Sequence, residues 1–145
     1  MISTLYLDLA TTTGWCTGTP DRYVSAVETF AKEDNNITRL IKFRNFLLTA
    51  GDFKRVVAES PFIMNRGNAG PILYGLHTTL QLFCYDNRNI ELVYIPPKTL
   101  KKFITGNGNA NKEKMMEALY KKYKIAVFND NQADAIALML YDHKN

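Results

Sequence analysis

The chain has 145 residues, of which 46% are hydrophobic and 22% charged, a composition that is ordinary for a globular protein. It predicts a single domain, residues 1–145, with a sizeable core. No apolar run approaches the roughly 18 residues of a membrane span, and no secretion signal is seen at the N-terminus, so we expect a cytoplasmic protein with no membrane partner. The two cysteines and two histidines form no metal-ligand pattern.

Positive charge is concentrated in one segment of the sequence. Residues 98–124 contain eight lysines against two glutamates, a local excess of six. The rest of the chain has 10 basic and 12 acidic residues, or a net charge of −2. A concentrated basic segment is typical of a protein that binds a polyanion such as nucleic acid. A solvated helix surface explains the same lysines, so both interpretations stay open.

Residue patterns predict the secondary structure in chain order. A strand at 5–9 places Leu5, Leu7 and Leu9 on one face and Tyr6 and Asp8 on the other. The elements that follow are a Thr/Gly turn at 11–14, strands at 15–18 and 22–30 joined by a hairpin, a helix at 37–48, a strand at 53–59, a loop at 60–70, a helix at 71–86, a strand at 91–95, and helices at 98–104, 112–124 and 129–141.

This order of elements predicts an α/β fold, in which helices flank a five-stranded mixed sheet. The first three strands should be antiparallel because short turns join them. The first, fourth and fifth strands should be parallel and central. At the start of the last helix, Asn129 and Gln132 have the spacing of a capping box. Ligands of open α/β sheets bind at the carboxyl ends of the strands, and we expect the functional residues there.

Carboxylates gather at this predicted edge. Asp8 and Glu59 end strands that should be neighbours, and Asp130 and Asp134 are four residues apart on one face of the last helix. Such a group cannot be fully ionised unless divalent cations neutralise it, and oxygen ligands favour Mg²⁺ or Mn²⁺. Paired metals are a common device for hydrolysing phosphodiesters. The alternative for Asp8 is a salt-bridged structural carboxylate at a strand end.

Four stretches of the sequence resemble the RuvC family of Holliday-junction resolvases, in the same order. They are Asp8 with the Thr-rich turn after it, residues 59–62, residues 100–112 and residues 132–138. The resemblance implies a ribonuclease H-like fold, a homodimer, and a nuclease of DNA recombination and repair that makes paired nicks at four-way junctions, with two Mg²⁺ or Mn²⁺ ions per active site. The short chain is more similar to phage-encoded members, whose location would be the host cytoplasm.

The resemblance also assigns catalytic metal ligands. Asp8, Glu59 and Asp134 match three acidic ligands of the family. The fourth lies three residues before the last one, where this chain has Asn131 instead of an acid. We expect the neighbouring Asp130 to serve as the fourth ligand, with Asn131 as the alternative.

The resemblance further assigns DNA-binding residues. Lys101 and Lys112 match basic residues that contact phosphate near the cut, and Phe62 matches an aromatic residue that stacks on unpaired bases. A lysine beside the scissile phosphate would stabilise charge that develops in the transition state. Glycines in the loop at 105–111 would let backbone N–H groups approach phosphate. The full predicted set is Phe62, Lys98, Lys101, Lys102, Gly106, Gly108, Lys112 and Lys114.

Three alternatives stay open at this point. Residues 8–14 also resemble the phosphate loop of actin-like phosphotransferases, although 145 residues supply only one of their two lobes. A chain with an amide at Asn131 is also consistent with a non-cleaving module that binds branched DNA. The helix at 71–86 is a candidate dimer interface through His77 and Gln81, and its burial on both sides within one domain is the alternative.

Overall fold

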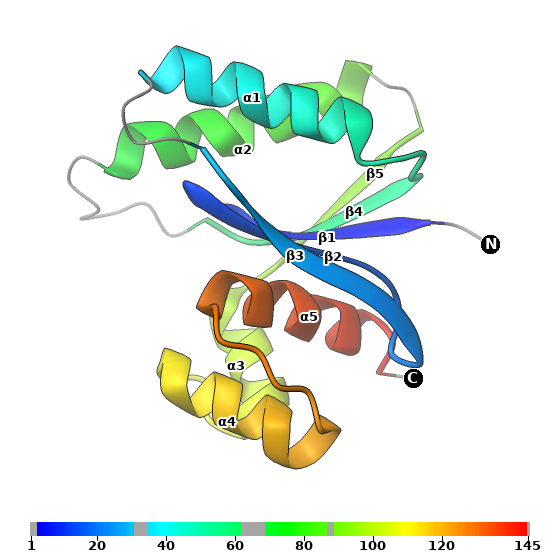
Figure 1. The fold of residues 1–145 in the computed structure, drawn as a ribbon, viewed down its shortest axis with the longest axis vertical. Coiled ribbons are helices and arrows are strands. Elements are labelled where there is room, and N and C mark those ends of the chain that lie inside the picture. Colours follow the sequence, from blue (N-terminus) through cyan, green and yellow to red (C-terminus); the bar gives the residue numbers. More distant parts are fainter. Residues whose placement is uncertain (1–2, 31–34, 62–68, 87–88, 145) are drawn as a thin grey trace.

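The structure is a computed structural model that describes residues 3–30, 35–61, 69–86 and 89–144. Within these residues, one mixed sheet has the strand order β3-β2-β1-β4-β5. Helices α1 and α2 cover one face of the sheet, and α3, α4 and α5 lie on the other (Figure 1). The strands are β1 (Thr4–Asp8), β2 (Thr12–Thr19), β3 (Arg22–Thr29), β4 (Arg55–Glu59) and β5 (Glu91–Ile95). The helices are α1 (Asn36–Thr49), α2 (Ala69–Asp86), α3 (Pro97–Thr105), α4 (Lys112–Tyr123) and α5 (Asp130–Asp142).

The pairing of the strands confirms the predicted mixed sheet. β1, β2 and β3 pair antiparallel, and β4 pairs parallel with both β1 and β5. Two details differ from the prediction. β5 lies at the edge of the sheet, where helices on both sides still cover it in part. β2 begins at Thr12 and so includes most of the turn predicted at 11–14, because Thr12 pairs with Thr29 and Gly14 with Asp8.

β1 is buried on both faces, and its alternating residues lie on opposite faces as predicted. Leu5 and Leu7 pack with α1 and α2, whereas Tyr6 faces the core formed with α5. All three side chains are at most 3% exposed. Burying an apolar side chain contributes roughly 1.5–3 kcal/mol, so β1 is held firmly between two cores. A rigid strand in this position fixes the residue at its end, Asp8.

Register then decides which carboxylates become neighbours. Leu7 of β1 lies opposite Ala58 of the parallel strand β4, and the next residues along the two strands are Asp8 and Glu59. Both strands end on the left in Figure 1, which is also where α5 begins. Parallel strands end at the same edge of a sheet, so both carboxylates project from it beside the first turns of α5.

The start of α5 confirms half of the predicted capping box. The side chain of Asn129 accepts a hydrogen bond from the N–H of Gln132 at 3.0 Å, which caps the helix. The side chain of Gln132 donates from Nε2 to Ser25 Oγ on β3 at 2.9 Å. Gln132 thereby ties α5 to the sheet, and the reciprocal half of the capping box, a bond from the N–H of Asn129 to Gln132 Oε1, is not seen among the described residues. No helix among the described residues has the length and apolar character needed to cross a membrane.

Candidate metal centre

Three carboxylates from three elements meet at the strand ends. Oxygen atoms of Asp8, Glu59 and Asp134 all lie within 4.8 Å of one another, and each residue is partly buried. They line a cleft of about 480 Å³ whose walls come from the ends of β1 and β4 and from α2, α3, α4 and α5. This is the convergence that the sequence predicted for these three residues.

The proximity of these carboxylates changes their acidity. Burial and the neighbouring charges of Asp134 and Glu59 raise the pKa of Asp8 well above its ordinary value, and its carboxyl group shares a hydrogen bond with Asp134. Burial, followed by the charge of Asp130, raises the pKa of Asp134 to about 6. Without a cation, part of the group is therefore protonated near neutral pH, because like charges in a buried site disfavour full ionisation.

The chemistry of this donor set fits a divalent cation. Carboxylate oxygens are hard ligands of the kind that Mg²⁺ and Mn²⁺ prefer, and a cation removes the repulsion that raises the pKa of Asp8 and Asp134. Asp8, Glu59 and Asp134 would hold the ion. A bound cation would supply charge to polarise a phosphate group and acidify a water molecule.

Asp130 and Asn131 take different positions in the same cleft. Both line it, but Asp130 is outside the close group of three. The Asp130 carboxylate instead lies 3.7 Å from Lys112 Nζ. The Asn131 side chain donates from Nδ2 to the backbone oxygen of Thr12 at 2.7 Å, and so links α5 to β2. A carboxylate at position 131 could not donate this bond, which gives the amide a structural reason. The fourth ligand stays a prediction.

Gly14 allows α5 to approach the sheet, a role that the sequence analysis missed. A Cβ atom at Gly14 would lie 2.0 Å from the backbone oxygen of Asn131 and 2.7 Å from the nitrogen of Gln132. Only a residue without a side chain permits this contact. A glycine inside a strand often marks close approach of another backbone, but Gly14 was predicted to lie in a turn, where this signal does not apply. Because α5 carries Asp134, Gly14 sets the position of one carboxylate of the cluster.

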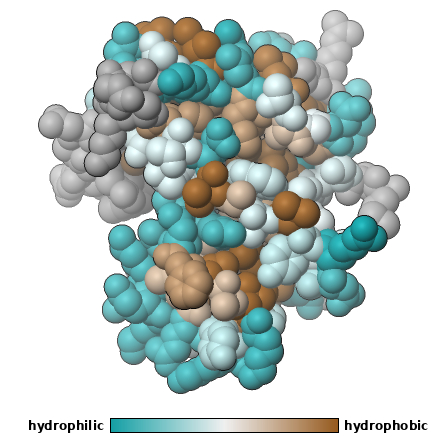
Figure 2. All heavy atoms as spheres, viewed as in Figure 1, coloured by the Kyte–Doolittle hydropathy of each residue, from teal (hydrophilic) through white to brown (hydrophobic). Residues whose placement is uncertain are grey.

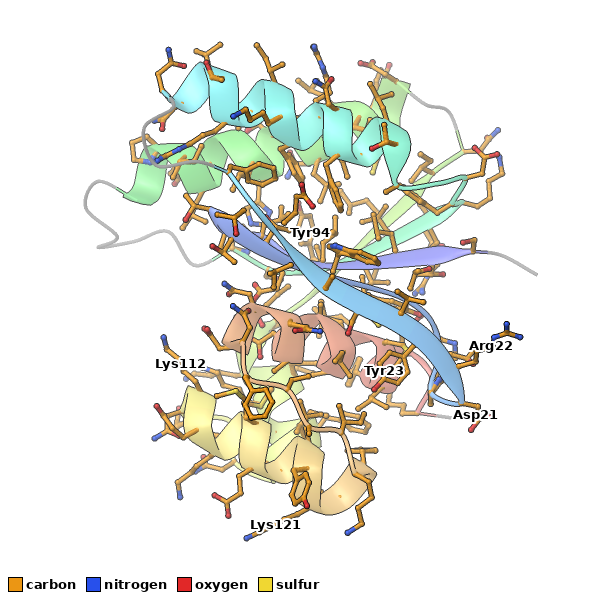
Figure 3. All side chains as sticks on the ribbon, in the orientation of Figure 1. Asp21, Arg22, Tyr23, Tyr94, Lys112 and Lys121 are labelled. Atoms are coloured by element: carbon orange, nitrogen blue, oxygen red, sulfur yellow. The ribbon has the colours of Figure 1, made fainter. Side chains whose placement is uncertain are left out.

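Two of the predicted lysines border the carboxylates. Lys101 of α3 and Lys112 of α4 line the cleft, and the positive charge of each favours the ionised form of Asp134. Figure 3 shows Lys112 and Lys121 toward opposite ends of α4, and of the two it is Lys112 that lines the cleft. Lys121 instead forms an ion pair with Glu117 at 2.6 Å. The single basic segment of the sequence is therefore divided between the cleft and other surfaces.

The remaining lysines of the segment have different surroundings. Lys122 Nζ donates to the backbone oxygen of Ile104 at 2.7 Å, which satisfies a carbonyl at the end of α3. Lys98, Lys102 and Lys114 are exposed and are not among the residues that line the cleft. Their contact with DNA stays a prediction.

The glycine-containing loop satisfies much of its own backbone. Gly106 has a φ of 85° at the C-cap of α3, and its N–H donates to the backbone oxygen of Lys102. The N–H groups of Asn107, Asn109 and Ala110 also have partners inside the loop. Helix termination thus accounts for Gly106, and the proposed phosphate contact through Gly106 and Gly108 stays a prediction.

Two further residues named from the sequence are Phe62, proposed to stack on bases, and His77, proposed to lie in a dimer interface. Phe62 lies outside the described residues. His77 of α2 lines the cleft at 5% exposure and shares a hydrogen bond with the hydroxyl of Tyr94 at 3.3 Å. Burial lowers the pKa of His77 to about 4, so it is neutral at physiological pH. Its side chain is inside the domain and does not form the exposed helix face that we had considered for a dimer.

Comparison with known proteins bears on the fold first. No protein-family model matches the chain. RuvC of Thermus thermophilus in complex with Holliday-junction substrate superposes with a TM-score of 0.74 and 15% identity, covering 97% of this chain and 92% of that one. The fold is that of RuvC. The fowlpox virus resolvase, solved with Holliday-junction DNA, matches 99% of this chain and 97% of its own at a TM-score of 0.64 and 13% identity.

Sequence similarity to RuvC is restricted to part of the chain. The crossover junction endodeoxyribonuclease RuvC of Brachyspira hyodysenteriae is 44% identical over 52 residues, which are 36% of this chain. The matched part spans about a third, 32%, of that relative. The likeness supports the resemblance on which the ligand assignments were based, whereas the superposition extends the RuvC fold over nearly the whole chain.

The carboxylate cluster should make the stability of the metal-free protein depend on pH. Burial gives Asp134 a folded-state pKa of about 6, above its ordinary value of 3.8. The folded state therefore holds a proton that the unfolded state releases between these values. The contribution is fully present below about pH 4 and is lost as the pH rises through 6. His77, whose pKa burial lowers to about 4, contributes in the opposite direction over the same range. The wild type should therefore be compared with Asp134→Asn by urea denaturation in EDTA, and the stability of the wild type relative to that variant should fall by on the order of 1 kcal/mol between pH 5 and 7.5.

Two controls accompany this measurement. Mg²⁺ should stabilise the protein more at pH 7.5 than at pH 5, since metal ligands must be deprotonated. Asp134→Asn lacks the contribution of Asp134, because the amide does not ionise in this range, but it retains that of His77. A metal-free wild type whose stability relative to Asp134→Asn is constant or increases from pH 5 to 7.5 would contradict the raised pKa of Asp134.

Proposed function

We propose that this protein is a structure-selective endonuclease that resolves Holliday junctions and related branched DNA by paired nicks. The observation that carries the proposal is a cluster of three carboxylates in a cleft that two lysines border. We further propose that the cofactor is Mg²⁺ or Mn²⁺, with two ions per active site. The similarity to RuvC in fold and in part of the sequence supports the choice of substrate. An origin in a phage stays a prediction.

The residues of the cleft would divide the work of hydrolysis. Asp8, Glu59 and Asp134 would hold the cations against the scissile phosphate. Lys101 and Lys112 would bind phosphate oxygens and stabilise the negative charge that increases in the transition state. The half-buried position of the carboxylates would limit the water that reaches them, which strengthens each of these interactions.

The alternatives predict different reactions. A non-cleaving module would bind junctions without nicking them, and an actin-like lobe would need a second lobe to enclose a nucleotide. We favour a nuclease because two lysines lie beside the acidic cluster. The negative charge of a bound phosphodiester would then be balanced by the lysines on one side and by cations held in the cluster on the other. The test is incubation of the full chain with a labelled synthetic four-way junction in Mg²⁺ or Mn²⁺. Symmetric nicks near the crossover are expected, and stable binding without cleavage in either metal would favour the binding module.

The lysines of the basic segment should separate into two functional groups. Lys101→Ala or Lys112→Ala should lower the single-turnover cleavage rate by about 10²-fold, because each removes a cation at the reacting phosphate. Lys121→Ala, which removes the ion pair with Glu117, should leave the rate within about twofold. Cleavage and fluorescence-anisotropy titrations at several salt concentrations distinguish rate from affinity. Equal loss of rate in all three variants would indicate a diffuse basic surface without a catalytic lysine.

We also propose a symmetric homodimer, since one active site makes one nick and resolution needs two. The exposed face of α2 supports this proposal. Tyr74 is 62% exposed, Leu82 58% and Tyr85 83%. Leu80 and His77, by contrast, are buried within the domain. The neighbouring α1 adds exposed Ile37, Ile41 and Leu48, and Figure 2 shows hydrophobic atoms over these helices. A C2 interface brings the same surface from both chains together.

A charge on this face should separate the dimer. Leu82→Glu and Tyr85→Glu alter exposed side chains, so each variant should fold with nearly unchanged thermal stability. Analytical ultracentrifugation should show a monomer for each, and junctions should be nicked on one strand only. Val24→Glu, which changes a side chain of β3 that is 60% exposed, is the matched control and should remain dimeric. Unchanged dimers of both α2 variants would place the interface elsewhere.

A further inference from the structure

Phe128 is exposed to an unusual degree. At 96% exposure it exceeds every other exposed large hydrophobic residue among those the structure describes. It lies between α4 and α5, in a segment where hydrophobic atoms reach the surface on the face shown in Figure 2. A Phe side chain in water gives up the stabilisation that burial would provide, so its position needs an explanation.

The backbone on both sides of Phe128 is anchored. Ile125 and Val127 pack against the hydrophobic core, and the N–H of Ile125 donates to the backbone oxygen of Leu119 at 3.2 Å. On the other side, Asn129 caps α5 through its side chain. Inward residues at 125 and 127 leave the side chain at 128 directed outward. The aromatic ring is therefore presented to solvent by a fixed backbone.

Phe128 is also close to the cleft. Asp130 lines the cleft two residues later, and two residues span at most about 7 Å of extended chain. Lys112, which also lines the cleft, has its Nζ 3.7 Å from the Asp130 carboxylate. An exposed apolar ring is thus only two residues along the chain from Asp130, which pairs with a cation of a cleft suited to a phosphodiester. A nucleotide strand offers both matching features, a phosphate for the cation and a flat base for the ring.

We propose that Phe128 stacks on a base of the bound DNA strand within a few nucleotides of the scissile phosphate and positions that strand in the cleft. This contact rests on the proposed nuclease function and adds a positioning residue to it. Every base has a face on which an aromatic ring can stack, and Phe has no hydrogen-bonding group, so the contact tolerates any sequence. A stacked base contributes about 5- to 150-fold to affinity.

The test combines affinity with a probe of the base itself. Four-way junctions carrying 2-aminopurine at one of the first three positions on either side of the cut are bound in Ca²⁺, and its fluorescence is measured. With the wild-type chain, binding should change the fluorescence at one position or more, and Phe128→Ala should remove that change. Phe128→Ala should also weaken junction binding by about 5- to 150-fold. Phe128→Trp should restore both signals, whereas Phe128→Leu, which is apolar but not aromatic, should not.

Tyr120→Ala is the matched control. Tyr120 is 60% exposed on α4, eight residues from Lys112 and so about 12 Å further along the helix. This variant should bind and cleave like the wild type. Wild-type affinity and fluorescence in Phe128→Ala would overturn the contact but leave the nuclease intact. A shift in sedimentation caused by Phe128→Ala would overturn it in favour of a contact between protein chains. A wild-type chain that binds no branched DNA would overturn the proposed function together with the contact.

Discussion

Removing one carboxylate from the metal centre should abolish junction cleavage without abolishing junction binding. The variants are Asp8→Asn, Glu59→Gln and Asp134→Asn. Each should lower the single-turnover rate by at least about 10²- to 10³-fold, because each removes a ligand and disturbs the charge that faces the phosphate. Binding should stay unchanged or become tighter, since each substitution also removes a negative charge from the DNA-facing cleft. Single-turnover cleavage in Mg²⁺ and Mn²⁺, with anisotropy titrations in parallel, measures both quantities.

Cleavage assays and thermal denaturation together distinguish whether Asp130 or Asn131 is the fourth metal ligand. If Asp130 is the fourth ligand, Asp130→Asn should raise the Mg²⁺ concentration needed for half-maximal cleavage. Asn131→Ala should instead lower thermal stability, because it removes the hydrogen bond to Thr12. The opposite pattern would make Asn131 the ligand. Full nicking activity in any of the three variants of the cluster would exclude that residue from the metal centre.

Gly14→Ala adds one carbon atom, yet it should lower both the stability of the protein and its cleavage rate. The new Cβ atom would lie 2.0 Å from the backbone oxygen of Asn131 and 2.2 Å from its carbonyl carbon. Both atoms belong to the first turn of α5, so the helix must move away from β2. We expect a loss of stability of about 3 kcal/mol or more. Asp134 moves with α5, and a displacement of about 1 Å can cost on the order of 10² in rate.

A second glycine provides the control for this substitution. A Cβ atom at Gly75 of α2 would meet only the end of the Leu40 side chain, at 2.8 Å, and a side chain can move more easily than a backbone. Alanine is also favoured over glycine inside a helix. Gly75→Ala should therefore leave the thermal stability and the cleavage rate close to those of the wild type. A Gly14→Ala protein with wild-type melting temperature and activity would show that α5 is not fixed by this contact.

The sequence alone determined the sheet and three carboxylates of the site. Alternation along β1 predicted that Leu5 and Leu7 lie on one face of the sheet and Tyr6 on the other, and this was confirmed. Asp8 and Glu59 were found together because adjacent parallel strands end at one edge of a sheet, where their last residues lie near each other. Asp134 followed from helical spacing and from the resemblance to RuvC. Each of these inferences depends on regular geometry, which a linear pattern contains.

Only the tertiary structure decided which residues serve the site and which serve the fold. Lys101 and Lys122 belong to one basic segment, yet Lys101 lines the cleft and Lys122 satisfies a carbonyl at the end of α3. Gly14 was assigned to a turn, and its contact with α5 involves residues more than a hundred positions away. The types and spacing of residues along the chain indicate the helix or strand that they form. The contacts of each residue depend on which other elements pack against that helix or strand.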